Sequence, residues 1–254
     1  MRVLIKLKSN TTQVYQNNYF HKFQGFVYNL LKGTEHEILH DKKGYKFFCF
    51  SNLFPLYEKN GEIPPIEDGG IRNFIVSSPS RIFIKTISKK LKDLEEIHIG
   101  DYSFSVEKFS EIIPVFKSNL RIISASPIIV RIPEMRYDEY FISEKARMKG
   151  YIYWRPEIDF RVFVKQLEEN LFKKYNEFYK TELKEFPIFE QFRFKKQCVN
   201  TLTIDGADTK ILGSIWEFSF SYLSKEQRKI LEFGIDCGFG ERNTYGFGFV
   251  NIVR

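Results

Sequence analysis

Cysteines and long apolar runs are scarce in this chain of 254 residues. Its three cysteines, Cys49, Cys198 and Cys237, form no Cys-x-x-Cys pair, which argues against a disulfide scaffold or a cysteine zinc site and favours a reducing compartment. No apolar run reaches the roughly 18–20 residues that a membrane span needs. Residues 1–8 are too few and too charged for a signal peptide and instead indicate a strand. We therefore expect a soluble, cytoplasmic protein with no membrane segment.

Positive charge and aromatic rings are both abundant. The net charge is +7, and residues 1–122 carry 18 basic and 13 acidic side chains, against 21 and 19 in residues 123–254. Aromatic residues make up 17% of the chain, with 27 Phe and 14 Tyr. Most of these rings are expected in the core. Because basic surfaces attract polyanions and unpaired bases stack on rings, the combination favours RNA as a partner.

The first half alternates predicted strands and helices. A helix is expected over 18–32, since its apolar residues recur at helical spacing and Gly33 is placed to end it. Thr34 and Glu37 have the spacing of a capping box, which predicts a short second helix. The remaining predictions for this half are strands over 2–8, 45–52, 71–76, 81–86, 102–109 and 111–118, and a helix over 87–97. This order is typical of the split βαβ pattern of a ferredoxin-like domain.

The pattern restarts in the second half. An apolar, β-branched run covers 121–131, and Ser224 with Gln227 forms a second capping-box spacing. The predictions here are a helix over 165–183, strands over 190–204 and 210–221, a helix over 224–235 and a last strand over 246–253, with 160–165 expected as a strand or turn. The sequence therefore predicts an α+β protein of two tandem ferredoxin-like (RRM-like) domains with antiparallel sheets, over 1–120 and 121–254.

Two Gly-aromatic-Gly units stand near the C-terminus. They contain Gly238, Gly240, Gly246 and Gly248, and they flank a five-residue segment that includes Arg242. Glycine permits positive φ and close approach of another backbone, and successive N–H groups in such a loop can form an anion-binding concavity. Arg242 could grip a phosphate with two hydrogen bonds. We therefore expect the four glycines and Arg242 to bind RNA.

This segment resembles the C-terminal glycine-rich signature of the repeat-associated RNA-binding proteins of CRISPR systems, and in particular of the repeat-processing endoribonuclease. The resemblance extends to residues 24–29, 40–51 and 126–128. It implies two tandem ferredoxin-like domains that bind RNA across their cleft and along the glycine-rich loop. It also implies that the partners are the precursor transcript and its repeat RNA, which is cut once per repeat, and that the guides pass to an interference complex. Exposed aromatics could serve a homodimer, which the sequence leaves open.

Tyr28, His40 and Lys46 are the candidate catalytic residues. Without a metal or other cofactor, RNA is cut when its 2′-OH attacks the adjacent phosphate, which requires a base, an acid and a cation. A helix, a turn and the start of a strand could bring the three side chains together. In the resembled family a Tyr, a His and a Lys in these places act as the catalytic set. The resemblance implies proton transfer by His40, orientation or protonation by Tyr28 and charge stabilisation by Lys46, and it leaves open whether His40 or Tyr28 is the base.

Two RNA-binding candidates and two competing functions complete the set of predictions. His21 and Lys32 share the polar stripe of the first helix with Tyr28 and are expected to bind RNA. A non-catalytic RNA-binding relative would have the same fold and loop. A zinc peptidase is suggested by His36-Glu37-x-x-His40, which requires both imidazoles on one face of a sustained helix. Because Gly33 and Gly44 bracket a segment of about two turns, the zinc site is the least favoured of these readings, and no metal is expected.

Overall fold

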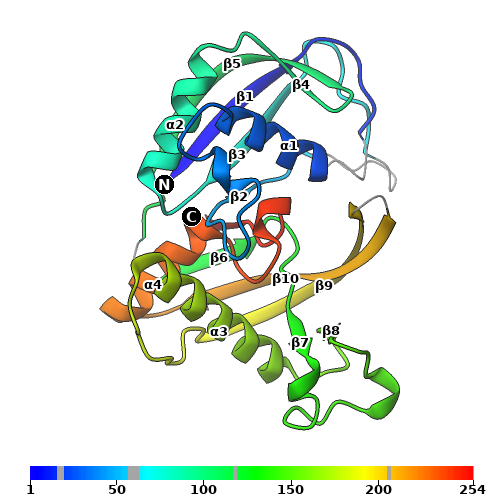
Figure 1. Cartoon of the computed structure of the whole chain (residues 1–254), viewed down its shortest axis with the longest axis vertical. Coiled ribbons are helices and arrows are strands. Elements are labelled where there is room, and N and C mark those ends of the chain that lie inside the picture. The colour runs from blue at the N-terminus through cyan, green and yellow to red at the C-terminus, as the bar shows by residue number, and fades with distance from the viewer. Residues whose placement is uncertain (16–19, 57–62, 117–118, 205–206, 254) are drawn as a thin grey trace. The chain divides into compact units, whose positions relative to one another are not determined.

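The computed structural model describes residues 1–15, 20–56, 63–116, 119–204 and 207–253. The chain forms two compact units (Figure 1). The first contains Met1–Pro114 and Thr244–Gly246, and the second contains Val115–Asn243 and Phe247–Arg254. Within the described residues, no helix has both the length and the apolar character that crossing a lipid bilayer demands.

The first unit has the strand order of a ferredoxin-like domain with one added edge strand. Among the described residues, its antiparallel sheet has the order β2-β3-β1-β5-β4. The apolar residues whose helical spacing predicted α1 are buried, and they are Phe20, Phe23, Val27, Leu30 and Leu31. The elements of this unit are β1 (Arg2–Ser9), α1 (Phe20–Leu31), the 3-10 turn η1 (Glu37–Leu39), β2 (Cys49–Phe50), β3 (Ile71–Ser77), α2 (Arg81–Lys92), β4 (Glu96–Ile99) and β5 (Tyr102–Ile112).

The second unit repeats the order. Its described strands form an antiparallel sheet in the order β11-β6-β10-β9, and a separate two-stranded ladder, β7-β8, lies in the connection between β6 and α3. The two tandem ferredoxin-like folds predicted from the sequence are therefore present. The elements are β6 (Leu120–Ser124), β7 (Arg131–Pro133), η2 (Glu134–Arg136), η3 (Glu144–Ala146), β8 (Tyr151–Tyr153), α3 (Phe160–Tyr179), β9 (Gln191–Ile204), β10 (Ala207–Phe220), α4 (Lys225–Cys237), η4 (Asn243–Tyr245) and β11 (Val250–Val253).

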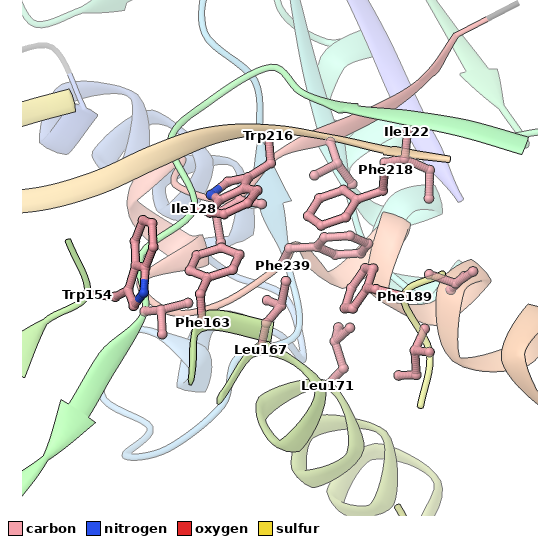
Figure 2. Packing of buried hydrophobic residues seen from close by; sticks show 14 of the residues in the cluster. Ile122, Ile128, Trp154, Phe163, Leu167, Leu171, Phe189, Trp216, Phe218 and Phe239 are labelled. Carbon is pink, nitrogen blue, oxygen red and sulfur yellow. The ribbon is translucent and has the colours of Figure 1, made fainter. Parts of the chain in front are cut away.

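Aromatic rings fill the core of the second unit. Figure 2 shows Phe163 of α3 stacked on Trp216 of β10, with ring centroids 4.1 Å apart. Phe239 lies 5.8 Å from Phe218 and 5.7 Å from Phe189, measured between ring centroids. Because Phe239 is the aromatic residue of the first Gly-aromatic-Gly unit, this part of the glycine-rich segment is a component of the core.

The glycines of this segment stand where a side chain would collide. A Cβ on Gly248 would lie 1.8 Å from the carbonyl oxygen of Phe239, and one on Gly240 would lie 2.3 Å from the carbonyl oxygen of Ile129. Both glycines have positive φ, 69° and 65°. The backbone therefore folds back on itself at contact distance, which only glycine permits without strain.

A buried ammonium holds the same segment. Lys174 of α3 is 1% exposed. Its Nζ donates to the carbonyl oxygens of Gly238 (2.6 Å) and Gly240 (3.0 Å) and to Oδ1 of Asn243 (3.0 Å). Asn243 in turn donates through Nδ2 to the carbonyl oxygens of Phe239 and Phe247. The loop is thus fixed from inside by hydrogen bonds to charged and amide groups.

Several predictions about local structure were wrong. Residues 81–86 form the first half of α2 instead of a strand, because Ser80 caps the helix by accepting from the Phe83 N–H, and because the buried residues that follow recur at helical spacing. The Thr34–Glu37 capping box does not form: the Thr34 hydroxyl donates to Leu31, and the Glu37 carboxylate accepts from Gly33. Residues 160–165 likewise begin α3, capped by Asp159, and helix 165–183 ends at Tyr179. The capping box of Ser224 and Gln227 is present, as predicted.

Replacing Lys174 by Met should lower the free energy of unfolding by about 2–4 kcal/mol, because three buried acceptors lose their donor. Denaturant unfolding measures this loss. Lys173→Met is the matched control, since the Lys173 side chain is 61% exposed and its Nζ lies 3.6 Å from Glu169. We expect the control to change stability by no more than about 0.5 kcal/mol. Equal losses in the two variants would contradict the account of the loop.

Candidate active site

Tyr28, His40 and Lys46 meet in the first unit. The Lys46 Nζ donates to the Tyr28 hydroxyl at 3.0 Å and to the backbone carbonyl of His40 at 2.8 Å. The imidazole of His40 stands edge-on to the ring of Tyr28, with ring centroids 5.1 Å apart. The Lys46 ammonium therefore joins Tyr28 of α1 and His40 at the end of η1 to the segment that carries Lys46.

The local backbone explains how Lys46 reaches this position. Tyr28 lies on α1 beside its buried face, whereas His40 ends η1. Between η1 and β2 the backbone takes positive φ at Gly44 (87°) and at Phe47 (51°). The hydroxyl of Ser78 donates to the Phe47 carbonyl at 2.7 Å and holds the backbone at the second of these positions.

A carboxylate lies against the imidazole. Nδ1 of His40 and Oδ1 of Asp41 are 2.6 Å apart. The side chain of His40 is 67% exposed, so its ring is open to a substrate. Asp41 was missed in the sequence analysis, although its position directly after the candidate His was a signal that could have found it.

Burial controls the protonation of the two other groups. It raises the pKa of the Tyr28 phenol to about 12, while hydrogen bonds with Thr244 and Gln24 act in the opposite direction. Burial also lowers the pKa of the Lys46 ammonium, which charge interactions with Tyr245 and Asp41 oppose. Near neutral pH the phenol is therefore protonated and can donate a hydrogen bond.

The C-terminal loop supplies neighbours to this cluster. Thr244–Gly246 belongs to the first unit, and the hydroxyl of Thr244 accepts from Nε2 of Gln24 at 3.4 Å. Gly246, with φ 83°, makes this approach possible because a Cβ there would lie 2.5 Å from Cε2 of Phe50. Thr244 and Tyr245 were not predicted as part of this cluster, since nothing in a single sequence indicates that positions so far apart are adjacent.

The expected RNA-binding residues have different surroundings. His21 and Lys32 are exposed, and the carbonyl of Lys32 accepts from Lys90 at 3.0 Å. Arg242, in the second unit, is half-buried with φ 55°, and its Nε finds no hydrogen-bond partner among the described residues. Such an unsatisfied donor suits an incoming phosphate.

The glycines themselves are buried. The N–H of Gly238 donates to Gly234, and that of Gly248 donates to Pro127. The expected anion-binding concavity therefore cannot use these two N–H groups. Gly240 and Gly246 are buried as well. In this segment, the residues between the two Gly-aromatic-Gly units are half-buried and so remain partly accessible.

The His36-Glu37-x-x-His40 motif does not form a zinc-protease helix. Its central residues form only the 3-10 turn η1. His36 packs against Phe83 of α2, with ring centroids 5.4 Å apart, whereas His40 packs against Tyr28 of α1. Among the described residues, no group of three or more His, Cys, Asp or Glu side chains is placed to hold a metal ion.

The Tyr28 phenol should ionise near pH 12 instead of near the ordinary value of 10.0. Because the folded state holds this proton more tightly than the unfolded chain does, ionisation of Tyr28 opposes folding as the pH rises above 10.0. The ultraviolet absorbance of phenolate, titrated in wild type and in Tyr28→Phe, isolates this group by difference. A difference component that titrates near pH 10 would show that burial does not shift the pKa of Tyr28.

Comparisons with known proteins agree in family. Residues 107–252, more than half of the chain, match the family model described as CRISPR associated protein Cas6, C-terminal. A CRISPR-associated endoribonuclease Cas6 of Methanocaldococcus jannaschii is 29% identical over 92% of this chain and 92% of its own length. That of Haloferax mediterranei is 28% identical over 100% of this chain and 94% of its own.

A solved structure agrees in fold. The structure titled CRISPR associated protein Cas6 superposes with a TM-score of 0.72 at 24% identity, and the match covers 100% of this chain and 99% of that one. The match to the family model, which spans more than half of the sequence, fixes the assignment: this chain belongs to the Cas6 family of CRISPR-associated proteins.

Proposed function

We propose that this protein is an endoribonuclease that binds CRISPR repeat RNA and cuts the precursor transcript within each repeat. The observation that carries the proposal is the joining of Tyr28, His40 and Lys46 by the Lys46 ammonium. Both curated relatives described above are named endoribonucleases. Membership of the family and the presence of a chemically competent cluster therefore point the same way.

The cluster contains the groups that RNA cleavage by its own 2′-OH requires. The imidazole of His40 transfers protons near neutral pH. The protonated phenol of Tyr28 donates to an oxygen of the reacting phosphate, and the ammonium of Lys46 stabilises the charge that develops on the phosphorane. Because these organic groups supply proton transfer and charge, the reaction needs no metal. The products are a 2′,3′-cyclic phosphate and a 5′-hydroxyl.

Binding draws on charge in both units. The chain carries a net charge of +7, and each phosphate that a basic side chain neutralises releases counterions. Arg242 has an unsatisfied buried Nε, and a phosphate oxygen would satisfy it. His21 and Lys32 are exposed on and just after α1, the helix that carries Tyr28. We assign all three residues to RNA binding.

The test is cleavage of labelled repeat RNA in the presence of EDTA. Wild type should cut once within each repeat, and an RNA with a 2′-deoxy substitution just before the cut should stay intact because it lacks the nucleophile. His40→Ala should lower the cleavage rate by about 100-fold or more. His98→Ala, which removes an exposed imidazole of β4, is the matched control and should cut at the wild-type rate.

Other outcomes would overturn the proposal in distinct ways. Tight binding of the repeat without any cleavage by wild type would identify a non-catalytic RNA-binding protein. Cleavage that EDTA abolishes would show that a metal ion takes part. Cleavage of the 2′-deoxy RNA would exclude attack by the 2′-oxygen.

A further inference from the structure

Asp41 is out of place in a segment expected to approach RNA. Between Glu37 and Glu58 it is the only acidic residue, and it is followed by Lys42, Lys43 and Lys46. A carboxylate there repels the phosphates that these lysines attract. An acidic side chain in this position therefore weakens RNA binding. Its presence points to a role other than binding the RNA.

The contribution is visible in its contact with His40. Oδ1 of Asp41 lies 2.6 Å from Nδ1 of His40, which is the distance of a strong hydrogen bond. A carboxylate can only accept, so Nδ1 must carry the proton. The proton on Nδ1 leaves Nε2 of the neutral ring with its lone pair free to accept a proton.

The backbone keeps the two side chains together. The N–H of His40 donates to Glu37 at 3.1 Å, and that of Lys42 donates to Ile38 at 3.1 Å. The backbone of His40 and that of Lys42, which follows Asp41, are thus bound into the η1 turn. Among the described residues, Tyr28 from α1 and Asp41 contact the His40 imidazole, and Lys46 from the segment before β2 contacts the His40 backbone carbonyl.

We propose that Asp41 is a positioning residue that fixes the His40 imidazole as the Nδ1–H tautomer, so that Nε2 acts as the general base. This inference rests on the proposed endoribonuclease function. Nε2 then accepts the proton of the 2′-OH, the 2′-oxygen forms a bond to phosphorus, and the bond from phosphorus to the 5′-oxygen breaks. The leaving 5′-oxygen takes its proton from the Tyr28 phenol, which solvent reprotonates.

Removing the negative charge separates this role from simple electrostatics. Through the loss of negative charge alone, Asp41→Asn should leave the affinity for RNA unchanged or increase it, because the substrate is a polyanion. A slower reaction in this variant cannot then come from weaker attraction. Asp41→Glu keeps the carboxylate and should recover part of the rate.

The kinetic test is single-turnover cleavage of repeat RNA across pH. Asp41→Asn should lower the rate constant about tenfold or more, with RNA affinity within about twofold of wild type. Glu35→Gln is the matched control: Glu35 precedes His36, and its Oε1 lies 3.7 Å from Nε2 of His36. This control should cleave at the wild-type rate.

A second readout does not depend on cleavage. The ¹⁵N chemical shifts of the His40 ring in the full-length protein should report Nδ1–H in wild type and a mixture of tautomers in Asp41→Asn. An Nε2–H tautomer in wild type would overturn the role of Asp41 even if the enzyme cuts RNA. An unchanged rate in Asp41→Asn, or an equal loss in Glu35→Gln, would do the same. If wild type cuts no RNA, the endoribonuclease proposal fails by itself, and the ring shifts still decide the tautomer.

Discussion

The proposed active site depends on the two hydrogen bonds that the Lys46 ammonium donates. The ammonium donates to the phenol of a helix residue and to the backbone of a turn residue, so it fixes two segments that share no secondary structure. The hydrogen bond to Tyr28 places a positive charge beside a phenol that burial keeps protonated. The same charge is available to a phosphate. The Lys46 ammonium thus both holds the two segments in place and supplies positive charge to the site.

In the second unit another lysine, Lys174, also holds a loop in place through its ammonium, but it has no catalytic role. Lys174 is buried and binds three acceptors of the glycine-rich segment. This anchor adds hydrogen bonds to a loop whose aromatic residues Phe239 and Phe247 are already buried in the core. The residues between the two Gly-aromatic-Gly units stay half-buried as a result, and they include Arg242. In this protein the glycines of the signature mainly allow the loop to fold, and few of them are placed to contact RNA.

Much of the fold followed from periodicity and caps. The apolar spacing of α1 and the Ser224–Gln227 capping box were predicted correctly because both are local signals. The Thr34–Glu37 spacing, which is the same signal, failed because Thr34 bonds back to Leu31. Residues 81–86 were predicted as a strand, whereas they form the start of a helix whose buried residues recur at helical spacing. Tertiary packing overrode local preference in that case.

The candidate site was harder to predict from the sequence. The set of Tyr28, His40 and Lys46 came from a family resemblance, and the structure brings the three together. The carboxylate of Asp41 and the approach of Thr244 required coordinates, since the first depends on a 2.6 Å contact and the second on a return of the chain. The buried glycine N–H groups were misjudged because a loop motif does not reveal which donors the protein itself uses.

The most direct test of the central claim is a double-mutant cycle between Lys46→Met and Tyr28→Phe, read as the rate constant for cutting repeat RNA. If Lys46 holds the phenol in addition to stabilising the phosphorane, the loss of rate in the double variant should be clearly smaller than the product of the two single losses. Losses that multiply in the double variant would show that the two groups act independently, and would contradict this account of the site.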